Sequence, residues 1–247
     1  MSHVSENMRA VLAKLEAAAK RAGREHSSVR LVAVTKTVST AQALEAVEAG
    51  AVILGENRVQ EALLKMREME TLKAARGQGS GGAAGAEIEW HLIGSLQKNK
   101  ARQAVGEFKL IHSLDSLDLA REIDRQAVKR GIIQKALLEI NIASEETKLG
   151  IRPEEAPGFM KEASRLENLK IIGLMCVPPF TEDPESSRPY FKEMNRLAAE
   201  LTLEGFDMTE LSMGMTQDYE VAAEEGATLV RVGTAIFGER DYGSTNA

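Results

Sequence analysis

Residues 31–36 read Leu-Val-Ala-Val-Thr-Lys, an apolar run that passes directly into a lysine. The run is continuously apolar rather than alternating, which is typical of a strand buried on both faces in a parallel sheet. In a parallel barrel, the carboxyl ends of the strands form the face that carries function. The stretch therefore predicts a buried parallel strand over Leu31–Val34, with Lys36 just beyond its functional end.

The same rhythm of short apolar runs continues along the chain, and helical patterns separate most of them. The further strand-like runs are Val52–Leu54, Ile88–Ile93, Lys109–Ile111, Ala136–Ile142, Leu169–Leu174, Thr209–Leu211 and Thr228–Val232. The helical patterns are Ser5–Ala22, Thr40–Glu48, Val59–Leu72, Lys98–Val105, Ser116–Lys129, Pro153–Arg165, Ser186–Leu203 and Asp218–Glu225. This α/β order predicts a single (β/α)8 TIM-type barrel over residues 1–247, with an extra N-terminal helix. An open doubly wound sheet is the alternative, although no Gly-x-Gly-x-x-Gly follows the first strand.

The composition narrows the class of protein. The 247 residues carry a net charge of −6 and are 43% hydrophobic, which is ordinary for a soluble globular protein and gives no general attraction to nucleic acid or anionic membranes. The one cysteine, Cys176, excludes an internal disulfide, and neither a signal peptide nor a membrane-length apolar run occurs. We expect a cytoplasmic monomer or weak dimer. The Gly-rich segment 76–86 lacks phosphate-loop spacing and predicts a surface loop.

Lys36 is the first residue to which chemistry can be assigned. A lysine at the mouth of a barrel is partly desolvated, which lowers its pKa, and the neutral amine attacks an aldehyde to form an imine. The plain alternative is a surface lysine that begins a loop.

Two loops near the end of the chain predict a phosphate site. Ser212 and Gly214 follow the seventh strand, and Gly233 and Thr234 follow the eighth. Barrels often hold phosphate in these two loops, where glycines admit backbone amides and hydroxyls add donors. A helix that begins near Thr216 or Gln217 would add its positive end. The alternative is a pair of ordinary turns.

Arg231 and Asn57 complete the candidate site. A charge inside the apolar strand around Arg231 is costly unless it is paired or used. At the mouth of a barrel, an arginine can face the ring nitrogen of pyridoxal 5′-phosphate (PLP), and it then stabilises carbanions only weakly; an arginine salt-bridged on a strand flank is the alternative. Asn57 can bond the phenolic oxygen of a ligand or cap the next helix. His91 and His112 are expected to be hydrogen-bonded core histidines.

Several segments, in order, resemble the PLP homeostasis proteins, the YggS/PLPBP family formerly called PROSC. They are AVTKTVS around Lys36, LGENRVQEA at 54–62, WHLIGSLQKNK at 90–100, HSLDS at 112–116, INIASEETKLGI around Asn141, GLMCVPPF at 173–180, and the stretch from Leu211 to Tyr242. The resemblance covers nearly the whole chain after the first helix. It implies a barrel like the N-terminal domain of alanine racemase.

The resemblance also implies a cofactor and roles for the residues. Lys36 would hold PLP as an imine (a Schiff base), Arg231 would face the pyridine nitrogen, and Asn57 would lie near the ring. The phosphate would be surrounded by Ser212, Gly214, Gly233 and Thr234. Family members are viewed as carriers or regulators of vitamin B6 cofactor supply with no established reaction, so PLP and apo-PLP enzymes are the expected partners.

Three other functions stay open. A PLP-dependent amino-acid racemase needs an acid or base on each face of the substrate carbon, and of Tyr190, Tyr219 and Tyr242 only Tyr219 lies near the predicted phosphate loop. The chain is not expected to hold the separate domain that carries this tyrosine in alanine racemases. An aldolase-like barrel would use Lys36 without a cofactor, and an interaction module would use PLP as a signal.

Overall fold

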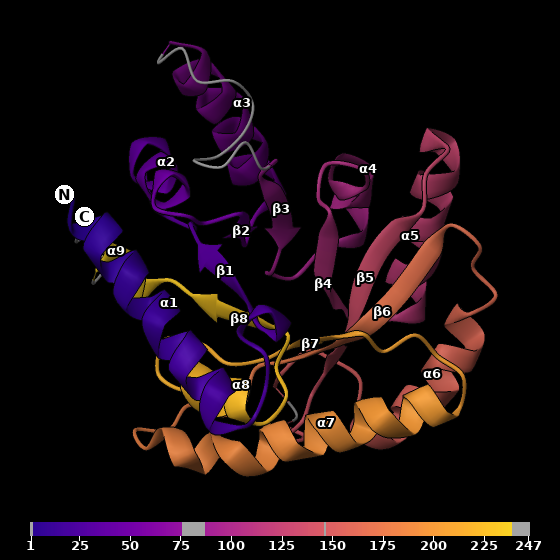
Figure 1. The fold of residues 1–247 in the computed structure, drawn as a ribbon. Coiled ribbons are helices and arrows are strands. Elements are labelled where there is room, and N and C mark those ends of the chain that lie inside the picture. The colour runs from indigo at the N-terminus through magenta and orange to yellow at the C-terminus, as the bar shows by residue number, and fades with distance from the viewer. Residues whose placement is uncertain (1, 76–86, 146, 239–247) are drawn as a thin grey trace, which may run out of the picture.

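The computed structural model describes residues 2–75, 87–145 and 147–238. In this part of the chain, neighbouring strands pair in parallel from β1 to β8, and β1 also pairs with β8, so that the sheet closes into a barrel (Figure 1). The strands are β1 Arg30–Val34, β2 Ile53–Glu56, β3 Glu89–Leu92, β4 Leu110–Leu114, β5 Gln134–Ile140, β6 Leu169–Cys176, β7 Glu210–Ser212 and β8 Leu229–Val232. The barrel prediction is confirmed, and the open-sheet alternative is wrong.

The helices lie outside the barrel. They are α1 His3–Arg21, α2 Thr40–Glu48, α3 Val59–Ala75, α4 Ala101–Ala104, α5 Leu117–Arg130, α6 Ala156–Ala163, α7 Arg188–Leu203, α8 Tyr219–Glu224 and α9 Thr234–Phe237. Short 3-10 turns are η1 His26–Ser28, η2 Lys98–Lys100, η3 Pro153–Glu155 and η4 Pro184–Ser187. Three of the predicted helices are therefore divided, because η2, η3 and η4 occupy their first turns. The Gly-rich segment lies outside the described residues.

The alternation of side chains along the strands divides the apolar residues into two clusters. A small cluster fills the barrel interior and consists of Val32, Ile53, Leu110, Leu137, Ile172, Met175 and Leu229. A larger cluster contains the intervening strand residues, such as Leu31 and Ala33, together with the inner faces of the helices. A strand residue therefore faces either the interior of the barrel or a helix, and this decides which polar residues can reach the mouth.

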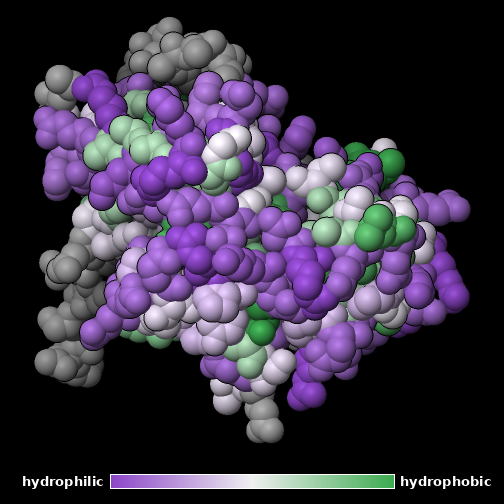
Figure 2. Space-filling view, turned by 60° about the horizontal axis from the view of Figure 1, so that its bottom comes forward, coloured by the Kyte–Doolittle hydropathy of each residue, from purple (hydrophilic) through white to green (hydrophobic). Residues whose placement is uncertain are grey.

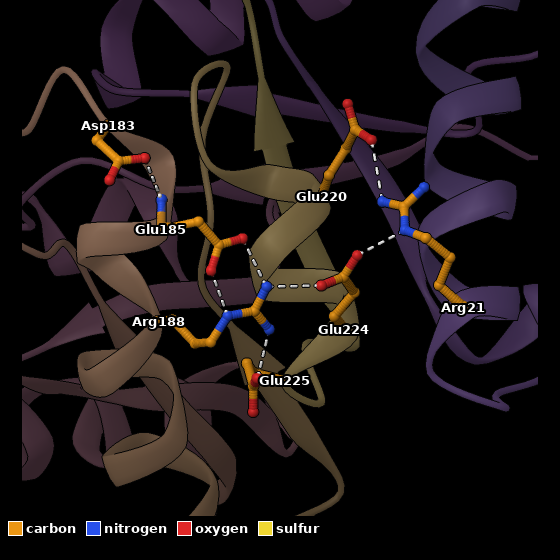
Figure 3. A network of polar contacts seen from close by, with 7 residues as sticks. All are labelled: Arg21, Asp183, Glu185, Arg188, Glu220, Glu224 and Glu225. Carbon is orange, nitrogen blue, oxygen red and sulfur yellow. Dashed lines mark hydrogen bonds and ion pairs between the residues drawn. The ribbon is translucent and has the colours of Figure 1, made fainter.

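The N-terminal helix is tied to the end of the barrel. Helix α1 lies beside α8 and α9, and the side-chain amide of Asn7 donates to the carbonyl of Ile236 at 3.0 Å (Figure 1). Figure 3 shows an outer network in which Arg21 of α1 and Arg188 of α7 bind carboxylates on η4, on α8 and just after α8. Those carboxylates are Glu185, Glu220, Glu224 and Glu225. The network fixes α8, the helix that follows the β7 loop.

The surface is mostly polar. On the face drawn in Figure 2, hydrophilic side chains predominate, and the hydrophobic ones gather in a few small groups. Within residues 2–75, 87–145 and 147–238, no helix combines the length and the apolar character that crossing a membrane requires.

Candidate cofactor-binding site

Lys36 follows β1, which lies between the strands that lead to two other predicted site residues, Asn57 after β2 and Gly233 after β8. Strand β1 pairs with β2 so that Val34 lies opposite Gly55, and it pairs with β8 so that Ala33 lies opposite Val232. The chain after β1 therefore runs beside the chain after β2 and the chain after β8. This register places the segment with Lys36, which is half-buried, beside the segments that carry Asn57 and Gly233, although all three are far apart in the sequence.

The turn that presents Lys36 is tight and strained. The backbone N–H of Val38 donates to the carbonyl of Thr35 at 3.0 Å, which closes a four-residue turn. Within it, Thr37 has a φ of 62°, in the left-handed region that β-branched residues avoid. Such a conformation costs about 1–3 kcal/mol and persists only where surrounding contacts impose it. The backbone next to Lys36 is thus held in place by its neighbours.

The loop after β7 depends on a glycine. Gly214 has a φ of 89°, and a Cβ at this position would lie 2.4 Å from the Cβ of Ala222 on α8. Residues 215–218 form a turn, in which the N–H of Asp218 donates to the carbonyl of Met215, and α8 begins only at Tyr219. The helix start expected near Thr216 or Gln217 is slightly too early, because the chain makes this turn before α8 packs against Gly214, whereas the predicted helical segment Asp218–Glu225 agrees with α8.

The loop after β8 adjoins this turn. Ser212 at the end of β7 lies opposite Leu229 at the start of β8, and the backbone N–H of Arg231 donates to the carbonyl of Gly214 at 3.0 Å, so that the chain after β7 runs beside β8. Gly233 follows β8 directly and is buried, whereas Thr234, the first residue of the four-residue helix α9, is exposed. The two loops predicted to hold phosphate are therefore neighbours, and their phosphate contacts stay a prediction.

Arg231 is buried and hydrogen-bonded to neutral groups, and the carboxylates of Asp218 and Glu139 act on it from beyond ion-pair distance. It is 5% exposed, and its guanidinium donates from Nη1 to the hydroxyl of Ser212 at 2.6 Å and from Nη2 to the carbonyl of Cys176 at 2.8 Å. Arg231 makes no ion pair with any of the described residues, so a strand-flank salt bridge does not account for it. Burial lowers the pKa of the guanidinium, while burial raises the pKa of the Cys176 thiol to about 12 and leaves it unreactive.

A chain of hydrogen bonds continues from Ser212 into the barrel. The Ser212 hydroxyl lies 2.8 Å from Nδ1 of His112, and Nε2 of His112 lies 3.0 Å from Nδ1 of His91. With both histidines neutral, an N–H at Nε2 of His91 toward the Glu89 carboxylate makes Nδ1 of His91 an acceptor, so that His112 donates from Nε2 and accepts at Nδ1 from the Ser212 hydroxyl, which itself accepts from Arg231. The remaining N–H of His91 faces the Glu89 carboxylate at 3.5 Å.

This direction of donation requires both imidazoles to be neutral. Burial lowers the pKa of His91 and lowers that of His112 well below its usual value. The expectation that these are hydrogen-bonded core histidines is confirmed. Their contact with Ser212, which orients the partner of Arg231, was not predicted from the sequence.

Glu139 is a partly buried carboxyl group that sequence reasoning missed. It lies two residues after Leu137 of the interior cluster on β5, so both side chains point to the inside of the barrel. In the closed sheet, β5 lies opposite β1. Burial raises its pKa to about 7; the negative charge of Asp115 acts in the same direction, and Arg231 opposes it. A single glutamate within the apolar run ALLEI was the available signal.

The end of β3 fixes the backbone of Asn57. A Cβ at Gly94 would lie 2.5 Å from the carbonyl oxygen of Asn57, so only glycine fits there. The Ser113 hydroxyl donates to the carbonyl of Gly94 at 2.7 Å, which ties this contact to β4. Asn57 is half-buried, and the predicted contact of its side chain with the ring of a bound ligand stays a prediction.

The described tyrosines lie away from the interior of the barrel. Tyr219 is 4% exposed within the larger cluster, between strands and helices, and burial raises its pKa to about 12. Tyr190 of α7 packs against the same cluster. Tyr242 lies outside the described residues. Neither Tyr190 nor Tyr219 is placed to act across the mouth from Lys36.

Comparisons with solved structures reproduce the barrel. A protein from Bifidobacterium adolescentis matches with a TM-score of 0.86 at 40% identity, over 95% of this chain and 94% of that protein. PipY of Synechococcus elongatus PCC7942, solved with PLP bound, matches with a TM-score of 0.74 at 38% identity, over 85% and 93%. Alanine racemase of Clostridium difficile 630 is 16% identical with a TM-score of 0.69 and shares the fold, over 57% of its own length.

Sequence comparisons give the family. Residues 7–241 match the family model for the alanine racemase N-terminal domain. The pyridoxal phosphate homeostasis protein of Aquifex aeolicus is 42% identical over 238 residues, which is 96% of this chain and 98% of that protein. The protein of the same name from Escherichia coli K12 is 35% identical over 98% of this chain and 99% of its own. The chain therefore belongs to the pyridoxal phosphate homeostasis protein family, within the wider group that shares the alanine racemase N-terminal domain.

Proposed function

We propose that this protein binds PLP as an imine on Lys36 and serves PLP homeostasis as a carrier or buffer, without catalysing a reaction of its own. PLP brings an aldehyde for the lysine, a phosphate for the two glycine-containing loops and a ring nitrogen for an arginine. The proposed binding residues are Lys36, Asn57, Ser212, Gly214, Arg231, Gly233 and Thr234.

The observation that carries the proposal is the buried guanidinium of Arg231. It donates to a hydroxyl and a carbonyl and forms no direct ion pair with a carboxylate of the described residues, while Asp218 and Glu139 act on it only from a greater distance. A buried charge in this state is costly unless a ligand uses it. Strand β8 adjoins β1, which leads into Lys36, so this charge and the predicted imine lysine belong to the same side of the mouth.

The relatives support a carrier more than an enzyme. Proteins 35–42% identical to this chain carry the name pyridoxal phosphate homeostasis protein, and PipY has been solved with PLP bound. A racemase would need a second acid or base opposite Lys36, and the described tyrosines lie in the layer between barrel and helices. An arginine at the ring nitrogen also disfavours carbanion chemistry, because it keeps its own proton.

A spectroscopic comparison tests cofactor binding. Wild type with added PLP should show imine absorption that borohydride removes, and Lys36→Ala should not. The matched control is Lys161→Ala, an exposed lysine of α6, which should behave as wild type. Imine absorption that survives in Lys36→Ala would refute Lys36 as the binding lysine, and absorption that never forms in wild type would refute PLP binding and favour an aldolase-like barrel.

A second experiment separates carrier from racemase. The loaded protein is incubated with amino acids in deuterated water, and separately with an apo-enzyme that requires PLP. We expect no exchange of the α-proton and recovery of the apo-enzyme's activity. Rapid exchange would establish racemase-type chemistry, and failure to transfer PLP would count against the carrier role.

We also propose that the chain acts in the cytoplasm as one barrel domain.

A further inference from the structure

A buried ion pair lies directly behind the turn that carries Lys36. Nζ of Lys65 on α3 lies 2.5 Å from Oε1 of Glu56 at the end of β2. The side chain of Lys65 is 10% exposed and that of Glu56 is 0% exposed. The ion pair is thus withdrawn from solvent, in the layer between the barrel and α3.

Both members of the pair bind Thr35. Lys65 donates to the carbonyl of Thr35 at 2.5 Å, and the Thr35 hydroxyl donates to Oε1 of Glu56 at 2.7 Å. Thr35, Glu56 and Lys65 therefore form one unit, the Thr35 clamp. Thr35 is held toward α3 and the chain turns directly after it, so the clamp fixes the backbone from which the side chain of Lys36 projects.

The clamp acts on the backbone that determines where Lys36 lies. The carbonyl of Thr35 belongs to the peptide group whose nitrogen is that of Lys36, and it also accepts the Val38 N–H that closes the turn. It therefore receives two donors, one from the turn and one from Lys65. The unfavourable φ of Thr37 in this turn needs contacts of this kind to persist.

Stability alone does not explain the pair. Burying two charges costs about as much as their attraction returns, and apolar replacements of such pairs are often neutral or stabilising. The second oxygen of Glu56 is buried with no hydrogen-bond partner among the described residues, which adds to the cost. The benefit of the pair is better sought in what it positions.

We infer that the Thr35 clamp is a positioning device for Lys36, with Lys65 and Glu56 as positioning residues that no ligand touches. This inference rests on the proposed function, because it concerns the lysine that would form the imine. It predicts that the clamp governs imine formation and leaves the phosphate and ring-nitrogen contacts unaffected, since those come from β8 and from the loops after β7 and β8.

The test uses two ligands and two variants of the full chain. PLP can form the imine, whereas pyridoxamine 5′-phosphate has the same ring and phosphate but no aldehyde. Lys65→Met removes the cation, and the double variant Glu56→Gln/Lys65→Met removes both charges, so that no unpaired buried carboxylate remains. In both variants we expect imine formation with PLP to slow by about 10- to 100-fold, as for a misplaced reactive group. Binding of pyridoxamine phosphate should stay within about 2-fold, well below the tenfold that 1.4 kcal/mol represents.

The double variant separates positioning from stability. It should recover the melting temperature lost in Lys65→Met but not the rate of imine formation, because the carbonyl of Thr35 still lacks its second donor. Arg188→Met, in the outer network, is the matched control and should leave imine formation unchanged (Figure 3). Restored imine formation in the double variant, or equal losses for both ligands, would overturn the inference. A wild type that forms no imine would instead refute the proposed function and remove the basis of the inference.

Discussion

Two arginines of this barrel show how differently the same side chain can be held. Arg188 lies in the outer network, where its partly exposed guanidinium contacts Glu185, Glu224 and Glu225 (Figure 3). Arg231 lies inside the barrel, 5% exposed, and its partners are the Ser212 hydroxyl and the Cys176 carbonyl. The more deeply buried arginine is therefore the one without a direct ion pair among the described residues, and the carboxylates of Asp218 and Glu139 act on it only from a greater distance.

The difference separates a structural cation from a binding one. Three carboxylates around Arg188 neutralise its charge and tie α7 to α8, so that no charge is left for a ligand. The neutral partners of Arg231, one of which is held by the histidine chain, fix the position of its guanidinium without forming an ion pair with it. A guanidinium that is fixed in position and has no direct ion pair can bind a polar group of a ligand that enters the mouth of the barrel.

The largest expected effect is on ligand affinity, in Arg231→Met. Hydrogen bonds to charged groups contribute about 1.5–3 kcal/mol, so PLP should bind about 10- to 100-fold more weakly. The unfolding free energy of the ligand-free protein should stay the same or rise, because a buried charge without a direct ion pair is removed. Titration with PLP and urea unfolding measure the two quantities. A less stable protein with unchanged affinity would make Arg231 structural.

An intermediate effect is expected from Glu139→Gln, in the dependence of stability on pH. The pKa of Glu139 is about 7 in the folded protein against an ordinary value of 4.5, so the folded state binds the extra proton between these values. Wild type should therefore lose stability as pH rises from 4.5 through about 7, on the order of 1–3 kcal/mol, and the variant should not.

Urea unfolding at several pH values measures this effect. Glu16→Gln, on the exposed face of α1, is the control and should keep the wild-type slope. Because Arg231 lowers the pKa of Glu139, Arg231→Met should extend the wild-type loss to higher pH. Parallel pH profiles for wild type and Glu139→Gln would show that Glu139 does not carry a shifted pKa.

The smallest effect is expected from Arg188→Met. Ion pairs with this much solvent exposure contribute about 0.2–1 kcal/mol each, so the loss in unfolding free energy should be about 1 kcal/mol and should shrink at high salt. PLP affinity should not change. Urea unfolding at two salt concentrations checks the first expectation, and PLP titration checks the second. An affinity loss as large as that of Arg231→Met would abolish the distinction between the two arginines.

The sequence predicted the barrel because the decisive signal is local. Continuous apolar runs such as Leu31–Val34 indicate buried parallel strands wherever they occur, and helix α2 has the predicted bounds Thr40–Glu48. The divided helices were missed because a 3-10 first turn differs from an α-helix only in its hydrogen bonds, which leave no pattern in the sequence.

The site could be predicted only in part, for the same physical reason. Arg231 stands out as a charge within an apolar strand, and Glu139 carries the same signal. The hydrogen-bond chain joins Ser212 to His112, 100 residues earlier, and the clamp joins Thr35 to Lys65, 30 residues later. Such pairs depend on strand order and register, which no spacing along the chain reveals.

The most direct test of the account is to find which lysine carries the cofactor. The protein is loaded with PLP, reduced with borohydride, digested and analysed by mass spectrometry. The account predicts a reduced pyridoxyl group on Lys36 in stoichiometric amount, and none on the buried Lys65. Modification of Lys65, or adducts spread thinly over exposed lysines with Lys36 unmodified, would contradict the central claim.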